Sequence, residues 1–354
     1  MTIFMELSSS PSDISSSQLL DNDDPSEKGR IYRFTPAIEA AVDVAIGLKR
    51  PLLVAGEPGC GKTELGYAVA RRLGIGSLYF FSTKSSSEAR ELFYTYDAVG
   101  RFREAQLNAT RTPEERAAAP QMTSGDFIHY QGLGRAILDA HPRDQVKDLL
   151  KGSGHAASPN QPRRSVVIID EIDKAPRDFT NDLLREIEDM SFRVPELGNR
   201  AGERDATPPG DKIPTDRWPI VIATSNEESQ MPDAFLRRCV FLAIEFPEPN
   251  VLKEILDLHF GSSGRDGPFP EVERGTLLTL FGTLRKSGMQ KDPGIAELID
   301  AGRIVAARPY EMTLAAWMPR LAPALIKLKS DLPVFKVALD ALPAAPPRVA
   351  VMTT

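Results

Sequence analysis

A glycine-rich octapeptide constrains the fold of this chain more than any other feature. Residues 56–63 read Gly-Glu-Pro-Gly-Cys-Gly-Lys-Thr and fit the pattern G-x-x-x-x-G-K-[ST]. The apolar run Pro51–Ala55 precedes the octapeptide, and Leu65, Val69 and Leu73 follow it at helical spacing. A buried strand, a tight turn and a helix in this order are typical of a sheet whose strands are joined by helices.

The octapeptide predicts a loop that binds the phosphates of ATP. Glycines let the backbone N–H groups turn inward, and the following helix N-terminus adds partial positive charge. We expect Lys62 to reach the β- and γ-phosphates and the Thr63 hydroxyl to bind Mg²⁺. The expected nucleotide contacts are Gly56, Glu57, Pro58, Gly59, Cys60, Gly61, Lys62, Thr63 and Glu64. The alternative is a glycine-rich turn with an incidental lysine.

Further apolar runs extend this pattern into an α/β fold. Helical patterns fall between several of them, most clearly over Phe179–Met190. Strands that alternate with helices favour a doubly wound parallel sheet. Thr35-Pro36 is a helix start, because threonine caps helices and proline suits their first turn. The four further expected strands are Leu78–Ser82, Ser165–Ile169, Pro219–Thr224 and Val240–Phe246.

The chain divides into regions of different character. Residues 1–29 are rich in Ser and Asp and predict a disordered tail. The α/β domain is expected over 30–247, and a small all-helical domain over 248–330, with helices at Val251–Phe260, Thr276–Leu284 and Ile295–Val305. A C-terminal tail is expected over 331–354.

Two stretches interrupt the strand–helix alternation and predict insertions on the sheet. Residues 84–164 contain helical segments, a turn at Gly100 and a span rich in Pro, Gly and Ser. Residues 191–218 are rich in Pro, Gly and charge. Long loops of this kind often carry function.

Two carboxylates follow the most β-branched strand of the chain. Asp170 and Glu171 come directly after Val166–Ile169. Parallel sheets bind ligands beyond the carboxyl ends of their strands. We therefore expect Asp170 to hold Mg²⁺ through water and Glu171 to orient and deprotonate an attacking water. The alternative is a solvated acidic turn.

Two further polar groups follow later strands. Asn226 ends the run that starts at Ile220, and it can hydrogen-bond an attacking water or the γ-phosphate; the alternative is an asparagine that caps the loop. Arg237 and Arg238 follow Phe235-Leu236. An arginine supplied by a neighbouring subunit can stabilise phosphoryl transfer. The alternative for the pair is a solvated helix face.

Composition narrows the remaining possibilities. The formal net charge of −6 argues against unspecific nucleic-acid binding, which depends on Lys and Arg neutralising phosphates. The two cysteines, Cys60 and Cys239, form no CxxC pair, which argues against a disulfide framework or zinc site. No apolar run reaches the ~18 residues of a membrane span, and the N-terminus lacks a secretory pattern, so we expect a cytoplasmic protein without membrane association.

Taken in order, these pieces resemble an AAA+ ATPase of the MoxR family, over residues 31–305. Residues 56–63 are similar to its Walker A segment, Val166–Glu171 to its Walker B, and Ala223–Asn226 to its sensor 1. Residues 231–238, Met-Pro-Asp-Ala-Phe-Leu-Arg-Arg, resemble the family segment that carries the arginine finger. The alignment gives Arg238 this role and puts Arg237 in place of an acidic residue, which leaves Arg237 as a possible stand-in.

The resemblance implies a five-stranded core, a β-hairpin insert over 191–218, a helical lid and a hexameric ring. It implies an ATP-hydrolysing chaperone or activator with a von Willebrand A-domain partner. A nucleotide-gated signalling or assembly module with little turnover is the alternative; the lid and the insertions disfavour a small-molecule kinase. The family's sensor 2 arginine falls on Gly294, and Lys291 is the cation that could replace it.

Overall fold

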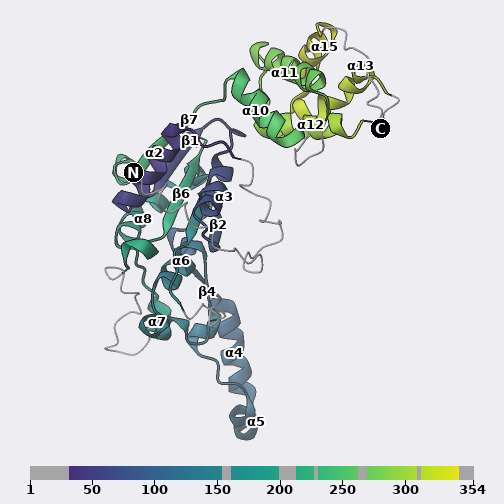
Figure 1. Ribbon diagram of the computed structural model, residues 1–354. Helices are drawn as coiled ribbons and strands as arrows, with labels where there is room; N and C mark the ends of the chain where they lie inside the picture. The colour runs from purple at the N-terminus through teal and green to yellow at the C-terminus, as the bar shows by residue number, and fades with distance from the viewer. Residues whose placement is uncertain are drawn as a thin grey trace, which may run out of the picture. The chain divides into compact units, whose positions relative to one another are not determined.

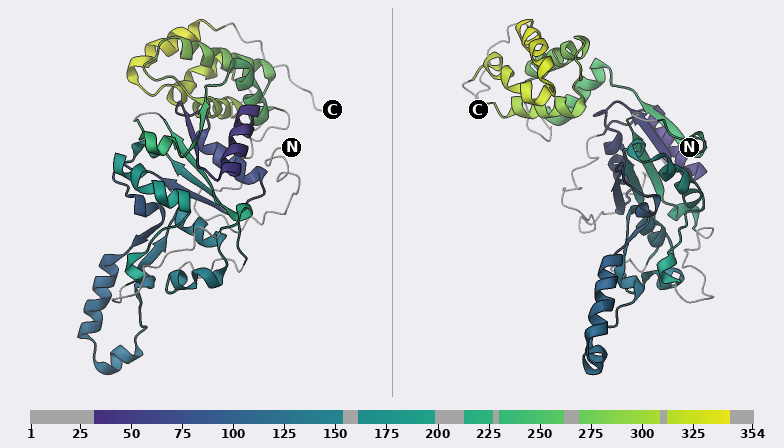
Figure 2. Two further views of the ribbon diagram at one scale, coloured as in Figure 1. Left: turned by 90° about the vertical axis from the view of Figure 1, so that its left-hand side faces the viewer. Right: turned by 180° about the vertical axis from the view of Figure 1, so that it is seen from behind.

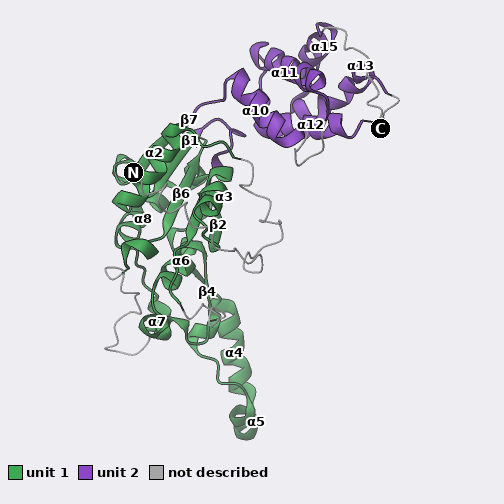
Figure 3. Ribbon diagram, in the orientation of Figure 1, with its two compact units in different colours: residues 1–55, 63–243 green, residues 56–62, 244–354 purple. Residues whose placement is uncertain are grey.

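The computed structural model describes residues 32–153, 161–198, 213–226, 230–261, 269–308 and 312–342. The chain separates into two compact units (Figure 3). The first contains residues 1–55 and 63–243, and the second contains residues 56–62 and 244–354. The expected N-terminal tail lies outside the described residues, as do residues 199–212 of the second insertion.

A five-stranded parallel sheet forms the centre of the first unit (Figure 1). Its strand order is β2-β5-β6-β1-β7, so the chain crosses over between strands that are distant in sequence. The first four residues of β5 are fully buried, which matches its apolar, β-branched sequence. The expected five-stranded α/β sheet is confirmed. Its strands are β1 (Leu52–Gly56), β2 (Leu78–Ser82), β5 (Val166–Asp170), β6 (Ile220–Ser225) and β7 (Val240–Ile244).

Helices cover both faces of the sheet. Successive side chains of a strand point to opposite faces. A Cβ on Gly66 of helix α3 would meet the side chain of Ile168, whereas one on Gly132 of helix α6 would lie over Val167. The two helices therefore pack on opposite sides of β5. The α-helices of this unit are α2 (Pro36–Leu48), α3 (Lys62–Arg72), α4 (Ala98–Thr110), α5 (Pro113–Ala118), α6 (Gly132–Ala140), α7 (Arg143–Leu150), α8 (Arg177–Asp189) and α9 (Asp233–Leu236).

Helix α2 begins where the sequence predicts. The Thr35 hydroxyl accepts a hydrogen bond from the Ile38 N–H at 3.3 Å, and Pro36 occupies the first turn. The cap satisfies a backbone donor that has no partner within the helix. Lys49, which caps the end of the helix, adopts a left-handed conformation, and the chain then continues into β1.

The first insertion contains strands that the sequence does not reveal. Strands β3 (Tyr94–Tyr96) and β4 (Ile128–Tyr130) pair antiparallel, and α4 and α5 extend beyond this small sheet (Figures 1 and 2). The expected turn at Gly100 is wrong, because Gly100 lies inside α4. Its N–H donates to the capping Asp97 carboxylate at 2.7 Å, and a Cβ there would collide with that carboxylate.

The β-hairpin implied for residues 191–218 stays a prediction, because residues 199–212 lie outside the described residues. Helix α8 ends at Asp189. The described residues on either side of 199–212 contain short 3₁₀ turns at Pro195–Leu197 and Thr215–Arg217.

The second unit has a separate helical core (Figure 3). Leu256, Phe260, Leu277 and Leu298 lie in that core. Its α-helices are α10 (Pro249–Phe260), α11 (Glu271–Lys286), α12 (Ile295–Ala306), α13 (Leu314–Trp317), α14 (Ala322–Leu325) and α15 (Leu332–Asp340).

The C-terminal tail expected from residue 331 is wrong for its first part. Residues 332–340 form α15, and its Phe335 and Ala338 are buried in the helical core. The apolar spacing of Leu332, Phe335 and Leu339 is the signal that would have shown it, and the neighbouring prolines obscured it.

Candidate nucleotide site

The strand order brings three strand ends of the first unit to one edge of the sheet. β6 lies between β5 and β1, with Ile169 opposite Ala223 and Ala55 opposite Ser225. Because the strands are parallel, the residues that follow them emerge on the same side. The acidic pair after β5 and Asn226 after β6 are therefore neighbours, and the phosphate loop (residues 56–63) starts from the end of β1.

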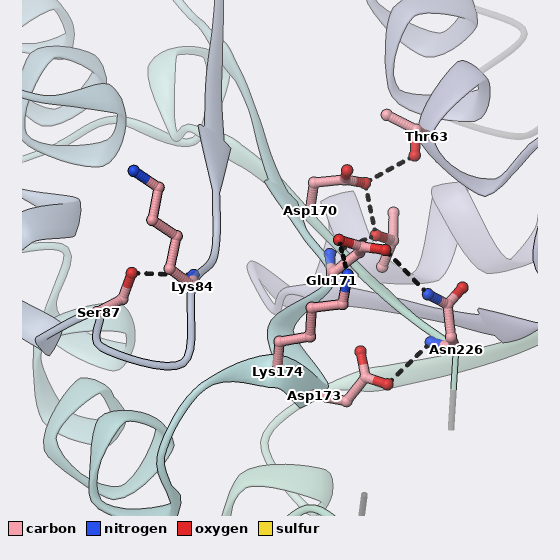
Figure 4. Close-up of polar contacts among 9 residues, drawn as sticks. Thr63, Lys84, Ser87, Asp170, Glu171, Asp173, Lys174 and Asn226 are labelled. Atoms are coloured by element: carbon pink, nitrogen blue, oxygen red, sulfur yellow. Dashed lines mark hydrogen bonds and ion pairs between the residues drawn. The ribbon is translucent and has the colours of Figure 1, made fainter. Parts of the chain in front are cut away.

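Asp170 accepts two hydrogen bonds at this edge (Figure 4). Its Oδ1 accepts from the Thr63 hydroxyl at 2.7 Å and from the Thr224 hydroxyl at 2.8 Å. Thr63 and Asp170 are the two residues predicted to hold Mg²⁺, and the fold joins them across more than a hundred residues of sequence. Oxygen donors of this kind suit Mg²⁺, which keeps several waters when it binds.

Glu171 is fixed through both its backbone and its side chain (Figure 4). Its backbone is left-handed, with φ 53° and ψ 49°, and its N–H donates to the Thr224 hydroxyl at 2.9 Å. Its Oε1 accepts from Asn226 Nδ2 at 3.1 Å, and its Oε2 accepts from Lys174 Nζ at 2.6 Å. A non-glycine residue rarely adopts this backbone conformation, and such strain gathers at functional sites.

Asn226 links the two strand ends. Its backbone N–H donates to Asp173 Oδ2 at 3.1 Å while its side chain holds Glu171. Asp173 is buried, which makes its acceptor position rigid. Asn226 therefore contacts the acidic residues after β5 through both its backbone and its side chain, and its role toward water or phosphate stays a prediction.

The loop itself has the geometry of an anion cradle. Gly59 and Gly61 adopt φ of 77° and 91°, a backbone region that side chains disfavour. Lys62 is buried, with 6% of its surface exposed, and its ammonium donates to the carbonyls of Gly56 at 2.8 Å and Glu57 at 2.7 Å. Among the described residues, Lys62 has no carboxylate partner.

These features fit a phosphate ligand. An ammonium group carries three donors, and two are used by the loop. A buried charge without a counter-charge is unfavourable, so the site favours an anion. Helix α3 begins at Lys62, and its first N–H groups have no carbonyl partners within the helix. No group of three or more His, Cys, Asp or Glu side chains in the described ranges is arranged to hold a metal ion.

The remaining loop residues have distinct environments. Cys60 is buried, and that burial raises the pKa of its thiol although Lys62 opposes the effect. The side chain of Glu57 is 57% exposed and pairs with Arg285. Glu64 lies in the first turn of α3. Because the pKa of its thiol is raised, Cys60 is a poor nucleophile, which agrees with a structural role in the loop.

The two arginines after α9 differ. The Nε of Arg238 lies 2.7 Å from Glu188 Oε1 at the end of α8, and its Nη1 donates to the Ala234 carbonyl at 3.0 Å. Arg237 is exposed, and its side chain has no hydrogen bond or ion pair within the part of the chain that the structure describes, although its backbone N–H donates to the Asp233 carbonyl at 3.0 Å.

The two candidate residues for sensor 2 also differ. Lys291 is exposed, and its backbone N–H approaches Asp331 Oδ2 at 3.4 Å. Gly294 is buried at the N-terminus of α12.

Sequence reasoning missed Thr224 and Lys174 as site residues. Thr224 is 1% exposed, and its hydroxyl both donates to Asp170 and accepts from Glu171. A threonine near the end of a buried, mostly apolar strand was the available signal. Lys174 lies three residues beyond Glu171, a spacing that allows contact within one turn.

The fold and the site define a P-loop NTPase of the AAA+ type, and the comparison with family models agrees. The model for the AAA domain of the dynein-related subfamily matches residues 51–239. The chain belongs to this family, whose members are in general nucleotide-hydrolysing ATPases. Within the described residues, no helix combines the length and apolar character needed to cross a membrane.

Solved structures of Thermotoga maritima RuvB are similar to this chain. One, described as a Holliday junction branch migration motor, is 15% identical, with a TM-score of 0.39, over 84% of this chain and 66% of that one. One variant with a single substitution is 14% identical, with a TM-score of 0.40, over 84% of this chain and 66% of that one. Another is 15% identical, with a TM-score of 0.39, over 76% of this chain and 60% of that one. This chain thus spans less than two thirds of the length of each of these structures. The comparison with curated proteins finds no match.

Proposed function

We propose that this chain hydrolyses MgATP as a MoxR-type AAA+ ATPase, and that it uses the energy to remodel or activate a protein partner. The observation that carries the hydrolytic part is the geometry of Glu171. Three hydrogen bonds and a left-handed backbone fix this carboxylate beside Asp170 and Thr63. A solvated acidic turn has no need of such a framework.

Each residue of the site has a distinct role in this proposal. Lys62 and the loop N–H groups bind phosphate oxygens, and Thr63 with Asp170 holds Mg²⁺. Bound MgATP supplies the phosphoanhydride bond that is cleaved. Glu171 takes the proton of the attacking water, and Asn226 orients the carboxylate that takes it. A positioned general base contributes about 10²–10⁴ in rate.

The exposed Arg237 supports an assembly in which copies of the chain complete each other's sites. A phosphoryl-transfer site needs positive charge opposite the loop, and Arg237 is available at the surface while Arg238 is paired. We therefore propose Arg237 as the arginine that reaches a neighbouring copy. A homo-hexameric ring and a von Willebrand A-domain partner follow from the resemblance to MoxR proteins.

The first test is nucleotide binding and turnover by the full chain. Calorimetry with ADP and ATP, with and without Mg²⁺, should show binding that Lys62→Ala abolishes. Phosphate release should require Mg²⁺ and stop when the metal is chelated. Normal binding by Lys62→Ala would contradict the assigned loop.

A second candidate function is a nucleotide-gated assembly module with little turnover. The contact that favours it is the ion pair between Lys174 Nζ and Glu171 Oε2 at 2.6 Å, which engages the second oxygen of the proposed base. With Asn226 on the other oxygen, each oxygen of the carboxylate already accepts a hydrogen bond from the chain. In this candidate, ATP occupancy changes assembly while the base is held back.

Lys174→Ala separates the two candidates. If Lys174 restrains the base, the variant should raise a slow basal turnover severalfold while nucleotide affinity stays unchanged. If Lys174 only orients Glu171 for hydrolysis, turnover should fall. Arg185→Ala is a matched control, since Arg185 forms an exposed ion pair with Asp189 on α8 instead.

A further inference from the structure

The phosphate loop and the N-terminus of α12 meet backbone to backbone within the second unit. The Ile295 N–H donates to the Gly59 carbonyl at 3.2 Å. A Cβ on Gly59 would lie 3.4 Å from the Cα of Gly294. Two glycines in contact let the two backbones approach this closely. The N-terminus of α12 is therefore in direct contact with the loop at Gly59.

This contact crowds any side chain at position 294. A Cβ on Gly294 would lie 3.0 Å from Glu297 Oε2, 3.1 Å from the Pro58 carbonyl oxygen and 3.3 Å from the Gly59 Cα. Two of these neighbours are backbone atoms of the loop, which cannot turn aside as a side chain can. A side chain at position 294 would therefore require the loop backbone to shift by a few tenths of an ångström.

A different arginine of the helical unit reaches the loop. Arg285, near the end of α11, donates from Nη2 to Glu57 Oε2 at 2.8 Å and from Nη1 to the Pro293 carbonyl at 2.9 Å. Its guanidinium lies 3.4 Å from the ring centroid of Phe246. The side chain is 17% exposed, so three contacts hold one planar group in place.

We propose that Arg285 is the positioning residue that couples the helical unit to the phosphate loop, through Glu57, in place of an arginine at position 294. The proposal rests on the nucleotide binding proposed above. The stacking on Phe246 and the bond to Pro293 fix the guanidinium beforehand, so the ion pair loses less side-chain entropy on forming.

The test is a double-mutant cycle on the full chain with Arg285→Ala, Glu57→Gln and both together. The first readout is hydrogen exchange of the nucleotide-free protein, which should rise at residues 56–62 and 293–297 in each variant. The second is the dissociation rate of mant-labelled ADP. Each single change should raise it about two- to fivefold, as expected for a partly exposed ion pair, and the double variant should add no further increase.

Two further variants sharpen the test. Arg320→Ala removes a lid arginine that stacks on Trp317 at 4.5 Å, and it should leave both readouts unchanged. Gly294→Arg should raise exchange at the loop, because it forces the two backbones apart.

The contradicting results are distinct from a failure of the proposed function. Loop exchange equal to wild type in Arg285→Ala, or single effects that simply add, would overturn the coupling, whether or not nucleotide binds. A wild-type chain that binds no mant-ADP would contradict nucleotide binding instead, and the exchange readout would still decide on Arg285.

Discussion

The acidic cluster at the ends of β5 and β6 and the arginine pair after α9 are the two charged parts of the proposed site in the first unit, and they differ in completeness. Asp170 and Glu171 are surrounded by partners from the same chain, including Thr63, Thr224 and Asn226. Arg237 is exposed and makes no ion pair among the described residues, whereas its neighbour Arg238 is bound to Glu188.

The difference indicates which half of the site one chain can build alone. A carboxylate general base has to be fixed in advance, and the chain provides every group needed to fix Glu171. An arginine that serves a neighbouring copy has to stay accessible on the surface until assembly. The contrast therefore supports a site that is completed between copies, and each prediction below either breaks or sharpens it.

The largest expected effect concerns the arginines. Arg237→Ala should lower turnover by about 10³-fold or more, since an arginine at the transferred phosphoryl group contributes that much. Arg238→Ala should cost less than about fivefold, because an exposed ion pair contributes little. Steady-state phosphate release with matched nucleotide binding measures both. The reverse order of the two effects would transfer the role to Arg238.

The second-largest expected effect concerns Glu171, the proposed base in the acidic cluster. Glu171→Gln keeps the size of the side chain and its contact with Asn226 but removes the base, so turnover should fall by about 10²–10⁴-fold. ATP affinity measured by calorimetry should remain close to that of wild type. Near-normal turnover would remove Glu171 as the base.

The smallest effect concerns the group that joins the two carboxylates. Thr224→Val keeps the shape of a buried residue but removes a hydroxyl that serves both Asp170 and the Glu171 N–H. Stability should fall by about 1–3 kcal/mol, because a partly buried N–H loses its partner. Denaturant unfolding measures this loss. Thr276→Val, at a partly exposed helix position, is the control, since its hydroxyl donates to the Val272 carbonyl of its own helix.

The sequence was informative where one local pattern decides the structure. The five strands, the loop glycines and the helix start at Thr35-Pro36 all follow from short-range rules, and the structure contains each of them. Strands β3 and β4 were missed because each has only three residues, too few to show a period. Gly100 was misread as a turn because its use depends on the side chain of Asp97.

The sequence could not predict which side chains of the site pair with one another. Adjacent arginines have the same chemistry, and only the position of Glu188 on α8 separates Arg238 from Arg237. The role of Thr224 likewise depends on the register of β6 beside β5. Contacts of this kind join residues about fifty positions apart, so no local pattern contains them.

The central claim is that one copy supplies Glu171 and another supplies the arginine to the same site. Co-expression of Glu171→Gln chains with Arg237→Ala chains tests it directly, since each variant alone should be inactive. Random mixing around a ring gives about a quarter of the interfaces an intact base and an intact arginine, so the account predicts recovery of a comparable share of wild-type turnover. No recovery in mixed assemblies of confirmed composition would contradict it.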